Sequence, residues 1–152
     1  MPNFRTEVLE RFGTALFVAA GAPADLARLV SQSLVAADVC GHESHGVMRI
    51  PRYLERVWNG TLHPMARPAI RRRQGANAVV DGGWGFGQAS AQFGTELAIE
   101  ICREHGQAGV ALGNTHHIGR LGDYAETLAA AGLAGLIMTG GGNRGGSVAP
   151  HG

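Results

Sequence analysis

The spacing of apolar residues changes at Leu62-His63-Pro64, and this change limits the chain to an architecture in two parts. Before this point apolar side chains recur every three or four residues, which predicts helices. The helical stretches are residues 4–19, the segment from Pro23 to about Cys40, and residues 44–60. After it, short apolar runs alternate with helical patterns, as in α/β proteins. We therefore expect a helical N-terminal segment over residues 1–62 and a mixed α/β layer over residues 63–152.

The second part has the element order of a layered α/β fold. The predicted elements are a hairpin with strands 69–73 and 78–81, a helix at 88–105, a strand at 108–112, a helix at 120–131 and a buried strand at 133–139. In a strand–loop–helix–strand unit, ligands bind at the carboxyl end of the strand, where residues 114–117 lie. Residues 140–152 are predicted to form a loop, with no further helix or strand. We therefore expect the sheet to be incomplete and the sequence to be truncated.

The stretch from Gly41 to Gly60 separates into two faces when it is drawn as a helix at about 100° per residue. The polar face, within roughly 80° of His45, carries Arg49, Arg52, Tyr53 and Arg56. The opposite face carries Val47, Ile50, Leu54, Val57 and Trp58. Ser44 is a suitable N-cap and Asn59-Gly60 a suitable end of the helix. Pro51 either kinks this helix or starts a second one.

The basic residues on this helix face have three possible interpretations. They keep the face solvated, as is common, or they bind nucleic acid, or they form an anion site. The formal net charge of +1, from 13 Lys+Arg against 12 Asp+Glu, disfavours nucleic acid as a partner. All the basic residues are arginine. The chain therefore has no lysine for a Schiff base or for a phosphate-binding P-loop.

The cysteines and the apolar runs bear on location. Cys40 and Cys102 lie near helix ends and outside any CxxC motif, so we expect buried free thiols, which are typical of a reducing compartment. Residues 1–10 have no apolar signal-peptide core, and runs such as Leu133–Met138 are too short to cross a bilayer. We expect a cytoplasmic protein without a membrane partner.

Neither a dinucleotide-binding Rossmann loop nor a metal site has its full pattern. The third glycine of Gly83-Trp84-Gly85-Phe86-Gly87 comes one residue early, and no helix follows the loop that begins at Gly140. The histidines at positions 42, 45, 116 and 117 lack the spacing of a zinc site, so no metal is expected. What remains is a histidine at a strand end and a Ser-His-Arg-Tyr set. An imidazole that exchanges protons and a guanidinium that holds a carboxylate suit a substrate with a carboxylate beside a carbonyl or hydroxyl.

Three segments resemble the type-2 malate/L-lactate dehydrogenase family. Residues 37–53, ADVCGHESHGVMRIPRY, are similar to the A-D-x-x-G-x-x-S-H-G-x-x-R-x-x-x-Y stretch of that family. Residues 114–119, NTHHIG, followed by GDYA at 122–125, resemble its N-S-x-H-F-G and G-x-Y-A stretches, and SVAPHG at 147–152 resembles its V-A-P-x-G-G segment. The whole chain is covered, but it matches only the N-terminal part of the family pattern.

The resemblance implies a non-Rossmann α/β fold and an oxidoreductase that transfers a hydride between NAD or NADP and a small 2-oxo or 2-hydroxy acid. His117 would exchange the proton, and Arg49 would hold the carboxylate with Tyr53 as a second substrate-binding residue. Ser44 and His45 would complete the catalytic set, and His45, Thr139 and Gly141 would contact the cofactor. The family also implies a homodimer. The alternative is a truncated, non-catalytic fragment that folds or oligomerises without activity.

Overall fold

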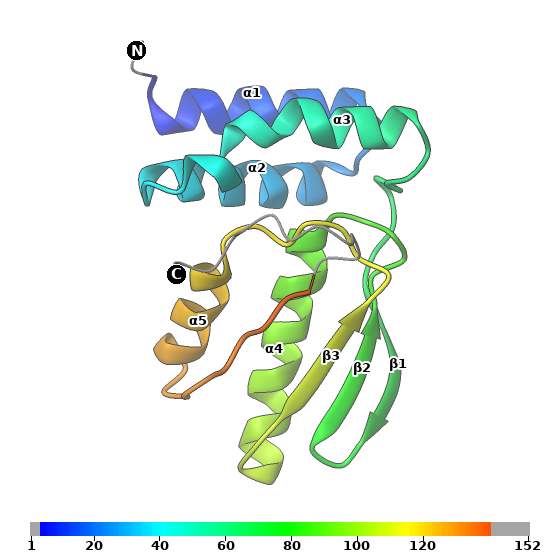
Figure 1. The fold of residues 1–152 in the computed structure, drawn as a ribbon, viewed down its shortest axis with the longest axis vertical. Helices are drawn as coiled ribbons and strands as arrows, with labels where there is room; N and C mark the ends of the chain where they lie inside the picture. Colours follow the sequence, from blue (N-terminus) through cyan, green and yellow to red (C-terminus); the bar gives the residue numbers. More distant parts are fainter. Residues whose placement is uncertain (1–3, 141–152) are drawn as a thin grey trace, which may run out of the picture.

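The first part of the chain forms a layer of helices. The computed structural model describes residues 4–140, and its first helices are α1 (Thr6–Ala19) and α2 (Ala24–Val39). Two short 3-10 turns follow, η1 (Glu43–His45) and η2 (Val47–Arg49), and then α3 (Ile50–Trp58). These elements lie together above the sheet (Figure 1).

The second part places a mixed sheet against one long helix. Its elements are β1 (Ala69–Gln74), β2 (Asn77–Asp81), α4 (Gly87–His105), β3 (Gly109–Gly113) and α5 (Leu121–Ala130). β1 pairs antiparallel with β2, and β2 pairs parallel with β3 through the α4 crossover, in the order β1-β2-β3. This arrangement confirms the predicted hairpin, the predicted helix at 88–105 and the mixed α/β class.

Apolar packing joins the two layers. Phe17 of α1 is fully buried, and its ring lies edge-on to Phe86, just before α4, with centroids 5.4 Å apart. The same cluster includes Val30, Leu34, Ile50, Leu62 and Ala89. Losing one such aromatic side chain typically costs about 3–5 kcal/mol. A second cluster, Ala78, Val80, Leu97 and Ile101, packs α4 on the sheet. The loop before α4 is therefore held against the helical layer.

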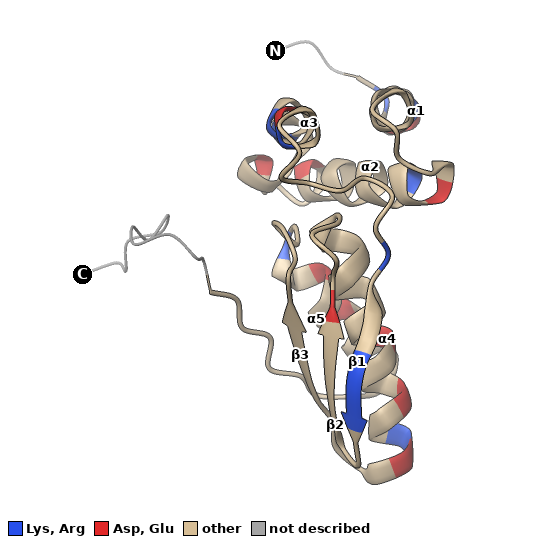
Figure 2. Cartoon of the chain, turned by 90° about the vertical axis from the view of Figure 1, so that its right-hand side faces the viewer, with Lys and Arg blue, Asp and Glu red and all other residues tan. Residues whose placement is uncertain are grey.

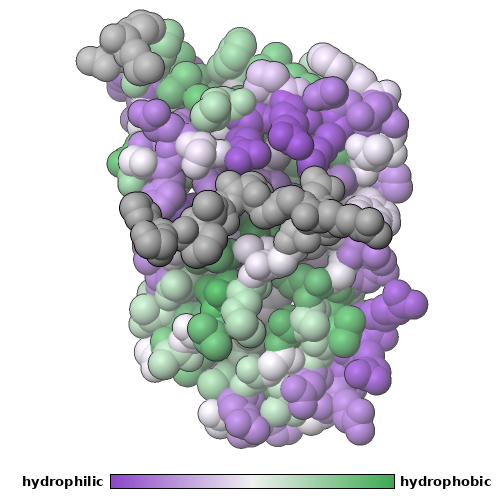
Figure 3. Space-filling model, viewed as in Figure 1, coloured by the Kyte–Doolittle hydropathy of each residue, from purple (hydrophilic) through white to green (hydrophobic). Residues whose placement is uncertain are grey.

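The buried strand predicted at residues 133–139 is wrong. After α5 the described chain runs extended to Gly140 without pairing to β1, β2 or β3. Leu136 is 83% exposed and Met138 80% exposed. Figure 3, viewed as Figure 1, shows apolar residues gathered on the lower part of the face toward the viewer. An apolar run is compatible with a strand, but a strand also needs a hydrogen-bonded neighbour, and periodicity does not report one.

Of the two interpretations of Pro51, the start of a second helix is confirmed, whereas one continuous helix over residues 44–60 is wrong in its first half. The α-helix begins only at Ile50, with Pro51 in its first turn, where the missing N–H costs nothing. Ser44 lies inside η1 and makes no capping hydrogen bond, so it is not an N-cap. The end at Asn59-Gly60 is confirmed, because Asn59 is the C-cap and Gly60 has φ +73°.

Several side chains expected to be buried are exposed. Trp58, which the helical drawing places on the apolar face with Ile50 and Leu54, is 75% exposed. Both cysteines are free, as expected, but Cys40 is exposed and Cys102 is only partly buried. Periodicity identifies an apolar stripe, whereas burial also requires a facing element for each residue on it.

Charged residues are distributed over both layers. Figure 2 shows basic residues on α3 and on β1, in separate parts of the molecule, with acidic residues on α2 and α4. Arg73 of β1 reaches Glu100 and Glu104 of α4 at 2.7 Å and 2.6 Å. Over residues 4–140, none of the helices has both the length and the hydropathy to cross a membrane.

Candidate active site

The first loop of the site, η1 to η2, is held by a carboxylate at the end of α2. Oδ2 of Asp38 accepts a hydrogen bond from the backbone N–H of Val47 at 2.9 Å. Gly46 lies directly against this carboxylate, because a Cβ built on it would stand 1.7 Å from Oδ1 of Asp38. Only a glycine lets the chain pass so close. The contact with Asp38 fixes the backbone at Gly46 and Val47, between His45 and Arg49.

The second loop follows β3, and it too is fixed through its backbone. A Cβ on Gly87, at the start of α4, would lie 2.2 Å from the carbonyl oxygen of His117, so this loop rests on the helix backbone. Arg56 donates a hydrogen bond to Nδ1 of His116 at 3.0 Å, and Nε2 of His116 donates to the carbonyl oxygen of Thr61 at 2.6 Å. His116, which the sequence left without a role, therefore ties this loop to α3.

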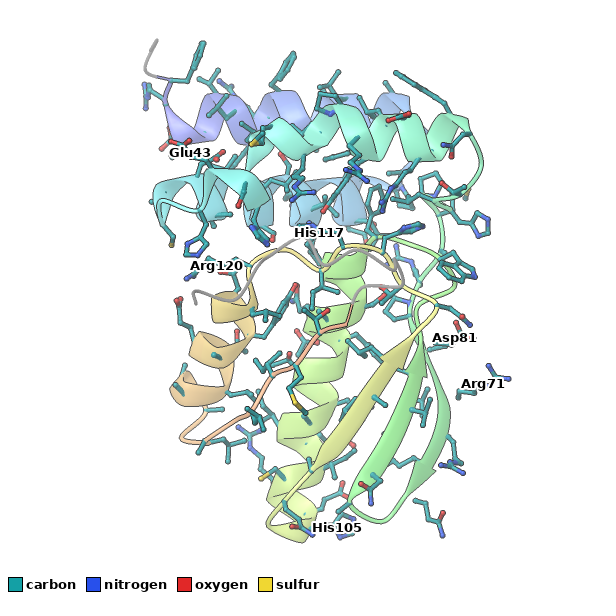
Figure 4. All side chains as sticks on the ribbon, in the orientation of Figure 1. Glu43, Arg71, Asp81, His105, His117 and Arg120 are labelled. Carbon is teal, nitrogen blue, oxygen red and sulfur yellow. The ribbon has the colours of Figure 1, made fainter. Side chains whose placement is uncertain are left out.

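The two loops meet at His45 and His117. Their ring centroids are 5.0 Å apart. Oγ of Ser44 lies 2.9 Å from Nδ1 of His45, and Nε of Arg49 donates to the carbonyl oxygen of Ser44. Figure 4 shows His117 between the helical layer and the loop that follows β3. The structure thus brings Ser44, His45 and Arg49, from the segment that includes η1 and η2, together with His117 from the loop after β3.

Tyr53 joins this group from the core and not from an open polar face, which corrects the expectation from the helical drawing. It is only 3% exposed, and its ring packs near Phe17 and Phe86 with centroid distances of 6.2 Å and 6.3 Å. Its hydroxyl oxygen lies 2.7 Å from Nδ1 of His117. Because α3 starts at Ile50 after two tighter turns, the angle of Tyr53 relative to His45 differs from that of one continuous helix.

Gln88 is a residue of the site that the sequence reading missed. It lies in the first turn of α4, is 1% exposed, and donates from Nε2 to the oxygen of Tyr53 at 2.9 Å. A glutamine near a helix start has no distinctive pattern. The available signal was its place directly after the glycine loop that opens α4.

Burial and positive charge keep the histidines neutral. Burial, with added repulsion from Arg49, lowers the pKa of His117 to about 4. Burial also lowers the pKa of His45, again with repulsion from Arg49. Burial raises the pKa of Tyr53 to about 12. At neutral pH the site therefore holds neutral imidazoles and a neutral phenol beside a guanidinium.

Three buried side-chain atoms have no hydrogen-bond partner in the described part of the chain: Oε1 of Gln88, Oγ1 of Thr115 and Nε2 of His117. Of these, Nε2 of His117 lies on the ring that faces His45. A buried nitrogen of this kind costs free energy unless a ligand atom pairs with it. A ligand oxygen in contact with Nε2 of His117 would supply the missing partner.

The proposed cofactor contacts are less well placed. Thr139 is exposed on the extended segment after α5, and Gly141 lies outside the described residues. Within residues 4–140, no three His, Cys, Asp or Glu side chains are grouped as metal ligands.

Comparisons with known proteins agree on one family. A model described as malate/L-lactate dehydrogenase matches residues 4–152. Hydroxycarboxylate dehydrogenase B of Escherichia coli (strain K12) is 39% identical over 134 residues, which are 88% of this chain and 37% of that protein. The L-lactate dehydrogenase of Cupriavidus necator is 41% identical over 130 residues, 86% of this chain and 37% of that protein.

Solved structures give the same picture. The malate dehydrogenase of Entamoeba histolytica superposes with a TM-score of 0.82 at 31% identity, covering 86% of this chain and 37% of that one. The sulfolactate dehydrogenase of Methanocaldococcus jannaschii gives 0.79 at 31% identity, with 82% and 36% covered. The chain thus spans somewhat more than a third of the length of these relatives.

Proposed function

Because the chain belongs to the malate/L-lactate dehydrogenase family, we propose that it contributes to hydride transfer between a nicotinamide cofactor and a small 2-oxo or 2-hydroxy acid. The observation that carries this proposal is the unpartnered Nε2 of His117 in a site that also holds Arg49. A ligand with an oxygen next to a carboxylate satisfies both groups. Hydroxycarboxylate, lactate, malate and sulfolactate, the acids that the relatives are named for, share this unit.

Arg49 would bind the carboxylate of the substrate. Its Nε is engaged by the carbonyl oxygen of Ser44, which leaves the two terminal nitrogens for an anion. A planar guanidinium anchored at Nε presents these nitrogens in the geometry that a carboxylate accepts in two parallel hydrogen bonds. The anchor also reduces the entropy that the side chain loses on binding.

His117 would exchange a proton with the substrate oxygen at Nε2. Its pKa is low in the free protein partly because Arg49 is positively charged. A bound carboxylate offsets that charge, so substrate binding raises the pKa of His117 towards the range in which it can donate a proton. Binding of the acid is in this way coupled to the ability of His117 to donate a proton.

Ser44 and His45 would shape the other side of the pocket. The hydrogen bond between Oγ of Ser44 and Nδ1 of His45 orients the His45 ring, which faces His117 at 5.0 Å. We propose that His45, with Thr139 and Gly141, contacts the cofactor. The nicotinamide ring of NAD or NADP would supply or accept the hydride.

The remaining features of the whole protein are also proposals. The division at residues 62 and 63, a homodimer and a cytoplasmic location all follow from the family resemblance and the sequence pattern. The chain spans 37% of the length of relatives such as the Cupriavidus necator enzyme, so the activity of the whole protein is itself a proposal.

The test is a hydride-transfer assay on the 152-residue protein, with NADH or NADPH and a panel of 2-oxo acids, following the nicotinamide absorbance. In the full-length protein we expect His117→Ala to abolish transfer and Arg49→Ala mainly to raise KM. Arg72→Ala, an exposed arginine on β1, is the matched control and should leave kcat/KM unchanged. Unchanged kinetics of His117→Ala contradict the proposal. A folded wild type without turnover favours the alternative, a non-catalytic fragment.

A further inference from the structure

Gln88, Tyr53 and His117 form a row of hydrogen bonds that runs from the core to the site. Gln88 is 1% exposed and Tyr53 3% exposed. Nε2 of Gln88 is 2.9 Å from the oxygen of Tyr53, which is 2.7 Å from Nδ1 of His117. Only the last member of the row faces the proposed substrate. The row links Gln88 of α4 to His117, so the group that donates at Gln88 can determine which group donates at His117.

The donor at one end fixes the direction of the row. An amide N–H only donates, so the oxygen of Tyr53 accepts from Gln88. The hydroxyl hydrogen of Tyr53 then has two acceptors within reach, Nδ1 of His117 at 2.7 Å and the carbonyl oxygen of His117 at 3.5 Å. The shorter contact is the better hydrogen bond. Nδ1 therefore accepts, and a neutral imidazole that accepts at Nδ1 carries its hydrogen on Nε2.

We propose that Gln88 is a positioning residue that acts through Tyr53 to keep the hydrogen of neutral His117 on Nε2, one of the buried atoms without a partner in residues 4–140. The resting site then presents a donor. A carbonyl oxygen of a 2-oxo acid only accepts, so it matches this donor directly. The identity of this ligand rests on the proposed function, whereas the place of the hydrogen is a property of the free protein.

Charging of His117 does not break the row. In an imidazolium both nitrogens donate, and the oxygen of Tyr53 has to accept from Nδ1 as well as from Gln88. The hydroxyl hydrogen of Tyr53 then turns to the carbonyl oxygen of His117, the second acceptor at 3.5 Å. Gln88 donates in both states, so it holds Tyr53 in place while the histidine changes charge.

The experiment is a long-range ¹H–¹⁵N correlation spectrum of the ligand-free, 15.8 kDa protein with labelled histidine. This spectrum distinguishes a ring nitrogen that carries hydrogen from one that does not. We expect Nε2 of His117 to carry the hydrogen at pH 8. A hydrogen on Nδ1 overturns the inference, since it means that the Gln88 amide faces Tyr53 with its oxygen.

Two substitutions test the role of Gln88 itself. In Gln88→Glu a carboxylate accepts from Tyr53, which then accepts from His117, so the hydrogen moves to Nδ1. Gln92→Glu is the matched control, because Gln92 lies one turn later on α4 and bonds to Glu96 instead; its His117 signals should match those of the wild type. An unchanged tautomer in a folded Gln88→Glu protein overturns the proposal.

A further variant covers the case in which Gln88→Glu does not fold. Gln88→Met keeps the volume but removes the donor, so Tyr53 is free to donate or to accept and a fraction of Nδ1–H should appear. No such fraction in this variant contradicts a role for Gln88. Because all of these readouts come from the ligand-free protein, failure of hydride transfer leaves them intact, and the two claims fail separately.

Discussion

Gly46→Ala should be among the most damaging single-methyl substitutions in the chain. The added Cβ would stand 1.7 Å from Oδ1, 2.3 Å from Cγ and 2.6 Å from Oδ2 of Asp38, so the carboxylate has to move. Moving it breaks the hydrogen bond from Val47, and a bond to a charged group contributes about 1.5–3 kcal/mol. Remaining overpacking adds about 1–3 kcal/mol. We expect a loss of about 3–5 kcal/mol in the free energy of unfolding.

The assay is urea unfolding followed by circular dichroism for Gly46→Ala, Asp38→Ala and the double variant. If the clash with Asp38 causes the loss, Gly46→Ala should cost less than about 1 kcal/mol once Asp38 is alanine, because close neighbours are not additive. Gly113→Ala is the control, since a Cβ on Gly113 meets nothing within 4 Å. An equal cost of Gly46→Ala with and without Asp38 refutes the reasoning.

Two further predictions concern the second loop. Gly87→Ala would put a Cβ 2.2 Å from the carbonyl oxygen of His117. We expect the free energy of unfolding in urea to fall by at least about 2 kcal/mol and the NMR resonances of His117 to shift. Unshifted His117 resonances would show that the loop does not rest on α4. The pKa of His117, about 4 in the folded state against an ordinary 6.5, means that between these pH values the unfolded chain binds a proton that the folded chain does not. Stability should therefore fall as the pH drops from 6.5 to 4, by about 1–2 kcal/mol after allowance for solvent screening, and His117→Gln should flatten this part of the profile; an equal slope in both proteins rules out the assignment.

The helices and the hairpin were predictable because their signals are local. The apolar repeat over residues 4–19 identifies α1 to within two residues, and the glycine at position 106 marks the end of α4. The segment after α5 failed for the opposite reason. Leu136 and Met138 have the composition of a strand, but a strand depends on pairing with distant residues.

The site was predictable only in part. Periodicity grouped His45 and Arg49 on one turn, and the resemblance to a family pointed to His117 at a strand end. The burial of Tyr53 was not predictable, because it depends on where α3 starts and on rings from two other elements. The only sequence signal for Gln88 is its place after the glycine loop, whereas its role follows from its distance to Tyr53.

The central claim is that Arg49 and His117 bind the same small acid. The pKa of His117, measured by NMR titration, tests this directly when it is compared with and without saturating pyruvate. A carboxylate placed against Arg49 removes part of the charge that depresses this pKa, so the account predicts a rise of about 1–2 units in the wild type and none in Arg49→Gln. An unchanged pKa with bound pyruvate, or an equal rise in Arg49→Gln, would contradict the claim.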